Sequence, residues 1–212
     1  MPRSRSSKST WLREHQSDPY VRRAQAEGYR SRAVYKLMEM DQRDGLIQNG
    51  MTVLDIGAAP GSWAQWVQQR IGRSGRLVAV DLLPIEPIEN VQFLHGDIRD
   101  ARLLEALDEL LDGRHTDLVI SDIAPNISGM ALVDQARGAE LLRTVLNVCE
   151  RVLRREGALL VKLFEGEQAA ALRRDCEMRF QRCVIRKPKA SRARSRESYL
   201  LARGYQHRAG GP

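Results

Sequence analysis

The stretch VLDIGAAPGSW, residues 53–63, decides the fold of this chain. A short apolar run with the character of a buried strand is followed by a turn of small residues and then by an amphipathic pattern that starts near Ser62. Small residues let a ligand approach the backbone, and the first turn of a helix offers free N–H groups. Because the third glycine of the dinucleotide fingerprint GxGxxG is absent, the loop is not that motif. On its own, the turn fits both a cofactor loop and a plain tight turn.

Strand and helix patterns alternate on the C-terminal side of this turn. The predicted strands span residues 51–56, 76–82, 91–96, 117–122, 158–164, 182–187 and 198–203. Apolar residues three or four positions apart, in the series that begin at Leu103 and at Leu141, predict helices between strands. The pattern therefore predicts an α/β fold with a doubly wound, mostly parallel sheet of seven strands. Only a loop joins the last two strands, so we expect them to pair antiparallel at one edge.

Length and composition predict one globular domain. The chain has 212 residues, of which 42% are hydrophobic and 29% are charged, which excludes a fibrous or wholly disordered protein. We expect disordered tails at 1–10 and 206–212 and a single domain at 11–205, made of a helical extension (11–50) and a Rossmann-like core (51–205). Residues 18–43 are predicted to be helical. No apolar run has the length of a membrane-spanning helix and no signal sequence is evident, so we expect a cytoplasmic protein.

The net charge of +7 is distributed unevenly along the chain. Residues 1–43 carry a net charge of +5, residues 44–185 carry −5 and residues 186–212 carry +7. Most of the basic residues are arginine, whose planar fork suits phosphate groups. An acidic body with basic ends favours a polyanionic partner, although solvated basic tails remain the alternative.

Two acidic residues follow the second and third predicted strands. Asp81 closes the second strand at about the distance from Gly57 at which doubly wound nucleotide-binding proteins place an acid on ribose hydroxyls. Asp97 follows the third strand and could accept a hydrogen bond from the amine of an adenine. Each acid could instead cap a helix. Together with the loop after Asp55, however, they lie where open α/β sheets bind ligands, and they indicate one adenosine-containing ligand.

A second group of polar residues follows the fourth strand and interrupts the fifth. Asp122 ends the fourth strand at the predicted reversal of the sheet, and Lys162 stands alone in the apolar run ALLVKLF. A buried lysine is costly unless it is paired, so Lys162 could be a structural lysine in an ion pair. A desolvated lysine beside an acid can also transfer protons in catalysis. In either case, the expected neighbour of Lys162 is Asp122.

The sequence has no pattern that indicates a metal site. Its three cysteines form no CxxC pair, and its four histidines are scattered along the chain. Neither zinc nor a disulfide framework is therefore expected.

Seven motifs in order give the chain a resemblance to a known family. SRAVYKL, DIGAAPGSW, DLLP, GDIRD, SDIAPNISG, VKLFEGE and RKPKASRARSRESYL resemble the FtsJ-type ribosomal RNA 2′-O-ribose methyltransferases over roughly residues 10–203. The resemblance implies a Rossmann-like class I methyltransferase sheet, with S-adenosylmethionine as cofactor. One departure is Ser62, where the family pattern has a second glycine.

The resemblance also implies which residues form the site. A Lys-Asp-Lys-Glu tetrad falls on Lys36, Asp122, Lys162 and Glu197. The residues expected to bind the cofactor are Gly57, Gly61, Trp63, Asp81, Asp97 and Asp122. In the reaction that we expect, Lys162 is the general base, Asp122 orients it, and Lys36 and Glu197 hold the lysine and the ribose hydroxyl in place. No metal is required.

Two basic segments flank the expected tetrad. One is the face formed by Arg22, Arg23, Arg30, Arg32 and Lys36, and the other is the loop that contains Arg192, Arg194 and Arg196. We expect Arg22, Arg23, Arg32 and the three loop arginines to contact RNA phosphates. By resemblance, the substrate is a uridine ribose in the A loop of 23S ribosomal RNA within the 50S subunit. We expect a monomer that acts on neither DNA nor a membrane.

Two other functions remain compatible with parts of the sequence. A dinucleotide-dependent oxidoreductase would use the same type of loop but is disfavoured by the missing glycine. A non-catalytic RNA-binding factor for ribosome assembly, built on a methyltransferase scaffold, would need only the basic ends. The presence of all four tetrad residues argues against that alternative.

Overall fold

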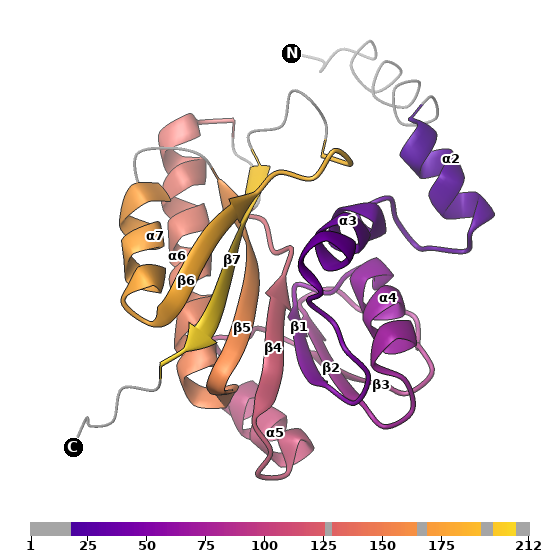
Figure 1. Ribbon diagram of the computed structural model, residues 1–212, viewed down its shortest axis with the longest axis horizontal. Helices are drawn as coiled ribbons and strands as arrows, with labels where there is room; N and C mark the ends of the chain where they lie inside the picture. Colours follow the sequence, from indigo (N-terminus) through magenta and orange to yellow (C-terminus); the bar gives the residue numbers. More distant parts are fainter. Residues whose placement is uncertain (1–17, 126–128, 165–168, 192–196, 207–212) are drawn as a thin grey trace, which may run out of the picture.

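A computed structural model of the chain describes residues 18–125, 129–164, 169–191 and 197–206 (Figure 1). Its strands form one seven-stranded sheet in the order β3-β2-β1-β4-β5-β7-β6. The strands are β1 (Thr52–Ile56), β2 (Arg76–Asp81), β3 (Val91–His95), β4 (Thr116–Ser121), β5 (Leu153–Phe164), β6 (Phe180–Arg186) and β7 (Glu197–Tyr205). Neighbouring strands are parallel from β3 to β5, whereas β7 runs antiparallel to β5 and β6. The predicted mostly parallel, Rossmann-like sheet is confirmed, and its antiparallel strand lies next to the edge strand β6.

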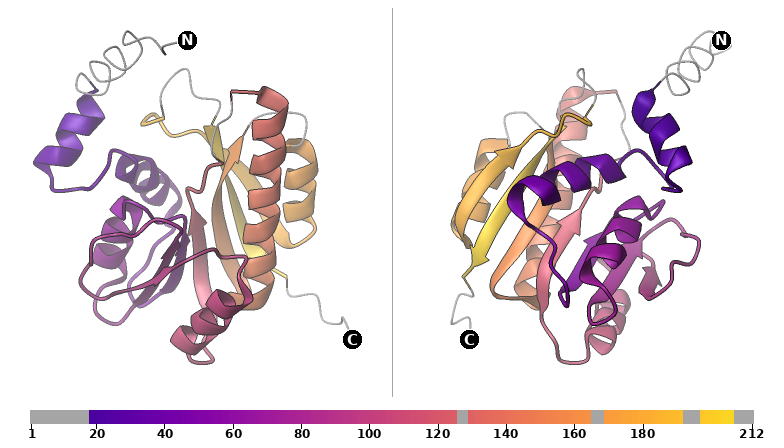
Figure 2. Two further views of the ribbon diagram at one scale, coloured as in Figure 1. Left: turned by 180° about the vertical axis from the view of Figure 1, so that it is seen from behind. Right: turned by 45° about the vertical axis from the view of Figure 1, so that its right-hand side comes forward.

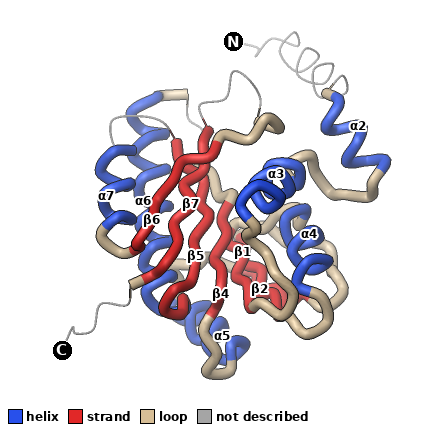
Figure 3. Tube along the Cα trace, in the orientation of Figure 1, coloured by secondary structure: helices blue, strands red, loops and turns tan. Residues whose placement is uncertain are grey.

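Helices cover both faces of the sheet (Figures 2 and 3). On one face lie α3 (Val34–Asp44) and α4 (Ser62–Ile71), and on the other lie α5 (Ala101–Leu111), α6 (Ala131–Val152) and α7 (Ala169–Glu177). Neighbouring residues of β1 divide between the two layers, because Val53 packs with α3 and α4 while Leu54 packs with α5 and α6. Burial on both faces explains why the central strands are apolar almost throughout. Within the described ranges, no helix combines the length and the apolar character needed to cross a bilayer.

The segment predicted to be helical, residues 18–43, is interrupted between two helices. Two helices occupy this segment: α2 (Pro19–Ala26), which is capped by the Asp18 carboxylate, and α3. Gly28 has φ +77°, a left-handed conformation that glycine adopts without strain, and it turns the chain out of α2. The predicted disordered tails 1–10 and 206–212 lie outside the described residues, except for Gln206.

The winding of the sheet reverses between β1 and β4. From β1 the chain moves outward through β2 to β3 and then returns to β4 on the other side of β1. Open α/β sheets bind ligands beyond the carboxyl ends of the strands at such a reversal. The loops that follow β1 and β4 contain Gly57 and Asp122, so the fold brings the expected cofactor loop next to the expected catalytic acid.

Candidate active site

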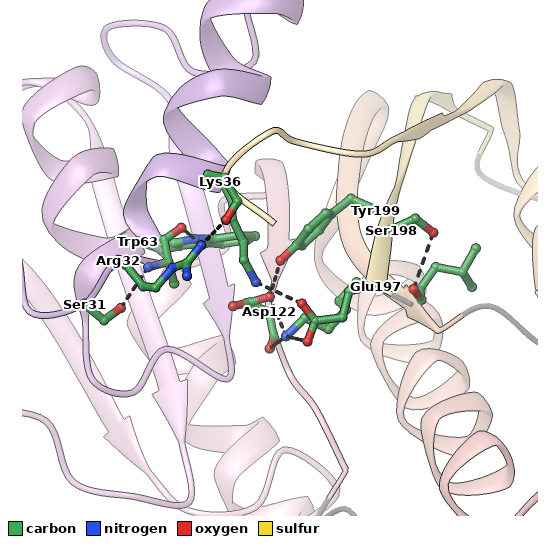
Figure 4. Close-up of polar contacts among 12 residues, drawn as sticks. Ser31, Arg32, Lys36, Trp63, Asp122, Glu197, Ser198 and Tyr199 are labelled. Carbon is green, nitrogen blue, oxygen red and sulfur yellow. Dashed lines mark hydrogen bonds and ion pairs between the residues drawn. The ribbon is translucent and has the colours of Figure 1, made fainter. Parts of the chain in front are cut away.

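The register between β5 and β7 puts polar side chains on one face of the sheet. Lys162 is paired with Tyr199, and Phe164 is paired with Glu197. Paired residues, and residues two positions apart on one strand, project from the same face. Lys162, Tyr199 and Glu197 therefore share the face that α3 and α4 cover. Lys36 reaches this face from α3, and Asp122 reaches it from the end of β4 (Figure 4).

The four predicted tetrad residues form a continuous chain of alternating charges. The Lys162 Nζ lies 2.7 Å from the Asp122 Oδ1 and also donates a hydrogen bond of 2.9 Å to the Asp122 main-chain oxygen. The same Nζ lies 4.0 Å from the Glu197 Oε1, and the Lys36 Nζ donates to the Glu197 Oε2 at 3.0 Å. The expected neighbour of Lys162 is confirmed. Both lysines have their ammonium groups paired, and the Asp122 contacts hold the Lys162 amine in one position.

Tyr199 is a site residue that sequence analysis missed. Its hydroxyl donates a 2.6 Å hydrogen bond to the Asp122 Oδ1, the same oxygen that contacts Lys162. The tyrosine is fully buried, and burial followed by the nearby Asp122 charge raises its pKa above the ordinary value, so the hydroxyl keeps its proton. Its ring packs against Trp63 with 5.8 Å between ring centres. The available signal was its position two residues after Glu197 on one strand, which places both side chains on one face.

Asp55 is a second residue whose environment the sequence did not reveal. Its carboxyl is 1% exposed, and its Oδ2 has no hydrogen-bond partner in the described part of the structure. Burial raises the pKa of Asp55 well above the ordinary value, and the charges of Asp122 and Asp81 raise it further. The Asp55 carboxyl therefore favours its protonated form, in the strand that leads into the loop at Gly57 and near the charges of Asp122 and Asp81. The apolar context VLDI was the only sequence signal for this burial.

The loop after β1 is shaped by close backbone contacts. Gly57 has φ +79°, and a Cβ at this position would lie 2.9 Å from the Ile123 Cβ in the loop after β4. The N–H groups of Gly57 and Ala58 both donate to the Val80 carbonyl, which fixes the loop to β2. Gly61 has φ +102° and precedes α4, which begins at Ser62 as predicted. Only glycine fits at residue 57 without displacing the neighbouring loop.

The Trp63 side chain is buried and bonded to the main chain of a neighbouring segment. Its indole N–H donates to the Ala33 carbonyl at 2.8 Å, and the side chain is buried between α4, α3 and Tyr199. The structure therefore gives Trp63 a link to the segment that leads into α3. Its predicted contact with the cofactor stays a prediction.

The two acids that we expected at an adenosine occupy different environments. The Asp81 carboxylate accepts hydrogen bonds from the N–H groups of Ala59 (2.7 Å) and Leu83 (2.8 Å), one on each oxygen. The Asp97 carboxylate is held by the Arg99 side chain through three hydrogen bonds of 2.6–3.1 Å. Its hydrogen bonds with Arg99 hold the pKa of Asp97 below the ordinary value. Both side chains are held in fixed orientations and have further lone pairs for a hydroxyl or an amine.

The predicted RNA-binding arginines divide into three groups. Arg22 and Arg23 are exposed on α2, where Arg23 pairs with Glu27 and lies over the Tyr35 ring. Arg32 is mostly buried and bonds to the Asp18 carboxylate and the Ala190 carbonyl, so it holds α2 to the domain and does not project into solvent as a phosphate ligand would. Arg192, Arg194 and Arg196 lie outside the described residues.

Comparisons with known proteins show the family to which the chain is related. The profile of the family described as FtsJ-like methyltransferase matches residues 29–205. A ribosomal RNA large subunit methyltransferase E from Legionella pneumophila strain Corby is 49% identical over 97% of this chain and 99% of its own length. The protein of the same name from Acidithiobacillus ferrooxidans is 52% identical over 97% of this chain and 93% of its own length.

Two solved structures share the fold. A ribosomal RNA methyltransferase from Plasmodium falciparum superposes with a TM-score of 0.77 at 30% identity and covers 84% of this chain and 98% of its own. Aeropyrum pernix fibrillarin, solved with bound S-adenosyl-L-methionine, superposes with a TM-score of 0.57 at 17% identity, over 82% of this chain and 75% of its own. At that identity, the likeness to fibrillarin concerns the fold alone.

Proposed function

The chain belongs to the FtsJ-like methyltransferase family, and we propose that it transfers the methyl group of S-adenosylmethionine to the 2′-hydroxyl of a uridine in the A loop of 23S ribosomal RNA. The observation that carries the proposal is the linked group of Lys36, Glu197, Lys162 and Asp122 at the reversal of the sheet. This group adjoins the glycine loop after β1, in which the Ala59 N–H donates to the Asp81 carboxylate. A purely RNA-binding scaffold would not need two paired lysines inside the domain.

The residues around the glycine loop fit the proposed cofactor. Asp81 would accept hydrogen bonds from ribose hydroxyls, and Asp97 would accept one from the adenine amine. Gly57 and Gly61 leave the backbone open to close approach, and the N-terminal turn of α4 offers free N–H groups. Asp122 would border the methyl-bearing end of the cofactor. S-adenosylmethionine supplies a methyl group on a positively charged sulfur, which is a good leaving group and needs no metal.

The side chains of the tetrad would divide the remaining work. Transfer to a hydroxyl requires that its oxygen be aligned with the methyl group and that its proton be removed as the new bond forms. We assign proton removal to the Lys162 amine, which must be in its neutral form when it accepts the proton. Asp122 orients this amine through two contacts, and Tyr199 holds Asp122. Glu197, fixed by Lys36, would position the ribose hydroxyl.

The substrate would be held by its backbone and selected by its shape. Arg22, Arg23 and the loop arginines 192, 194 and 196 would contact phosphates, which gives affinity and salt dependence but little choice of sequence. Selection would come from the folded A loop as the 50S subunit displays it, and the 2′-hydroxyl would distinguish RNA from DNA. Replacing the three loop arginines by alanine should weaken RNA binding and flatten its salt dependence.

The proposal is tested by methyl transfer to large subunits that lack the modification. Purified 50S particles from a strain without this enzyme are incubated with methyl-labelled S-adenosylmethionine and either the wild-type chain or Lys162→Ala. We expect one methyl group per particle with the wild-type chain, none with Lys162→Ala, and none on a DNA version of the loop. Binding of the particles by both proteins without transfer by either would instead support the non-catalytic assembly factor.

A further inference from the structure

Arg30 was expected on the basic face that meets RNA, but its guanidinium is engaged by backbone carbonyls of the protein itself. Its Nη1 donates to the Pro60 carbonyl at 3.1 Å and to the Glu86 carbonyl at 2.7 Å, and its Nη2 donates to the Pro87 carbonyl at 3.0 Å. Pro60 lies in the glycine loop after β1, while Glu86 and Pro87 lie in the segment between β2 and β3. One side chain therefore joins two loops that are 26 residues apart in sequence.

These two loops are the ones that Asp81 also joins. The Asp81 carboxylate bonds to Ala59 in the first loop and to Leu83 in the second. Arg30 makes the same connection through neighbouring residues, Pro60 in the first loop and Glu86 in the second. Asp81 is the residue that we assign to the cofactor ribose, so the Arg30 contacts border the proposed cofactor site on both of its loops.

The guanidinium is packed closely against the glycine loop. A Cβ at Gly61 would lie 2.7 Å from the Arg30 Nη1 and 3.1 Å from the Ile88 Cδ1. Glycine at residue 61 thus makes room for the arginine, in addition to its left-handed φ of +102°. The loop conformation and the arginine position depend on each other.

The backbone on which Arg30 stands is itself fixed to α4. The Arg30 N–H donates to the Gln65 Oε1 at 3.0 Å, and the Gln65 side chain donates to the Gly28 carbonyl at 3.1 Å. The hydroxyls of Ser31 and Ser62, the first residue of α4, lie 2.8 Å apart. These bonds restrain residues 28–31, so the main chain that carries the Arg30 side chain is held in place.

We propose that Arg30 is a positioning residue of the cofactor site, which holds the Pro60 loop and the segment at residues 86–87 together before the cofactor arrives. This inference rests on the proposed function. Because a preformed site avoids the cost of ordering loops on binding, loss of Arg30 should weaken cofactor binding although we assign the side chain no contact with the cofactor. Phosphate binding by Arg30 would instead require it to give up hydrogen bonds that are already formed.

The test compares Arg30→Ala and Arg30→Lys with Arg43→Ala, which removes an exposed arginine of α3 outside these contacts. Calorimetric titration with S-adenosylhomocysteine in the absence of RNA should show binding weakened by roughly tenfold or more in Arg30→Ala. Arg30→Lys should recover part of that loss, because an ammonium can still donate to one or two of the carbonyls. Arg43→Ala should bind like the wild-type chain.

Kinetics and RNA binding separate positioning from simple destabilisation. At saturating cofactor, kcat of Arg30→Ala should return to near the wild-type value while the KM for the cofactor is raised, and RNA affinity should match that of Arg43→Ala. Amide hydrogen exchange in residues 57–61 and 84–90 should be faster in Arg30→Ala when no ligand is present. Arg30→Lys provides the same readouts if the alanine variant does not fold.

The opposite pattern would overturn the inference. Unchanged cofactor affinity together with weaker RNA binding in Arg30→Ala would make Arg30 a phosphate ligand. A wild-type chain that binds neither S-adenosylmethionine nor S-adenosylhomocysteine would overturn the proposed function, and the inference with it. Normal wild-type binding with an equally tight Arg30→Ala variant would overturn the inference alone.

Discussion

Replacing Tyr199 by phenylalanine removes one atom from the centre of the candidate site. The lost hydroxyl donates at 2.6 Å to the Asp122 Oδ1, which also lies 2.7 Å from the Lys162 amine. Phenylalanine keeps the ring that packs against Trp63 and leaves no cavity the size of a side chain. The substitution therefore tests whether the orientation of Asp122, and through it of Lys162, limits the rate.

The size of the effect follows from this geometry. A hydrogen bond to a charged group contributes about 1.5–3 kcal/mol. If the whole of this free energy stabilises the transition state, loss of the hydrogen bond lowers kcat by roughly 10- to 150-fold. Because its raised pKa keeps Tyr199 protonated, the ratio of wild-type to variant rates should not change across the neutral pH range.

Single-turnover methyl transfer to 50S particles at saturating cofactor measures this rate directly. The affinity for S-adenosylhomocysteine serves as the control and should change little, since the ring that packs on Trp63 is kept and the hydroxyl bonds to neither Asp81 nor Asp97, the acids that we assign to adenosine. A variant with a wild-type rate would refute the idea that Tyr199 positions the Asp122–Lys162 pair. A variant with a normal rate but weak cofactor binding would mean that the Tyr199 hydroxyl supports the cofactor site and not the Asp122–Lys162 pair.

Three further predictions concern neighbouring residues. Lys162→Arg should fold and bind S-adenosylhomocysteine normally but transfer no methyl group, because guanidinium accepts no proton near neutral pH; retained transfer would mean that Lys162 acts only as a positive charge. Asp81→Ala should weaken S-adenosylhomocysteine binding by about 1.5–3 kcal/mol in calorimetry, and equal affinity would remove Asp81 from the ribose site. Asp55 has a folded-state pKa raised by burial and by two nearby acids, so its proton stabilises the folded chain at low pH, and this contribution is lost as pH rises from about 4 toward the raised pKa. Asp55→Asn should therefore gain stability relative to the wild-type chain over that interval, by up to about 1.4 kcal/mol per pH unit in urea unfolding, and a difference that does not change with pH would contradict the raised pKa.

Sequence patterns predicted the sheet well because the spacing of apolar residues and the residue types of turns are local properties of the chain. The strand that ends before Gly57 and the helix that begins at Ser62 are found where the pattern put them. Lys162 was recognisable because a lone lysine in a buried strand needs a partner, and Asp122 was the acid at the adjacent strand end. The break of the predicted helix at Gly28 was missed because one glycine costs a helix only about 1 kcal/mol and does not by itself decide its end.

The residues that sequence analysis misassigned are those whose partners are distant. Arg30 and Arg32 look like solvated charges in sequence, yet their partners are backbone carbonyls at residues 60, 86, 87 and 190. A carbonyl acceptor leaves no trace in the sequence, because every residue has one. Tyr199 was missed for a related reason, since its hydroxyl reaches Asp122 only through the register of β7 against β5.

The chemical position of the transferred methyl group tests the proposed function most directly. Large-subunit RNA labelled by the wild-type chain is digested to nucleosides and to fragments, and both are analysed by mass spectrometry. We predict a single 2′-O-methyluridine in the A loop of 23S ribosomal RNA, which is absent after incubation with Lys162→Ala. Label on a base, on protein or on another RNA segment would contradict the proposed function even if cofactor binding were as expected.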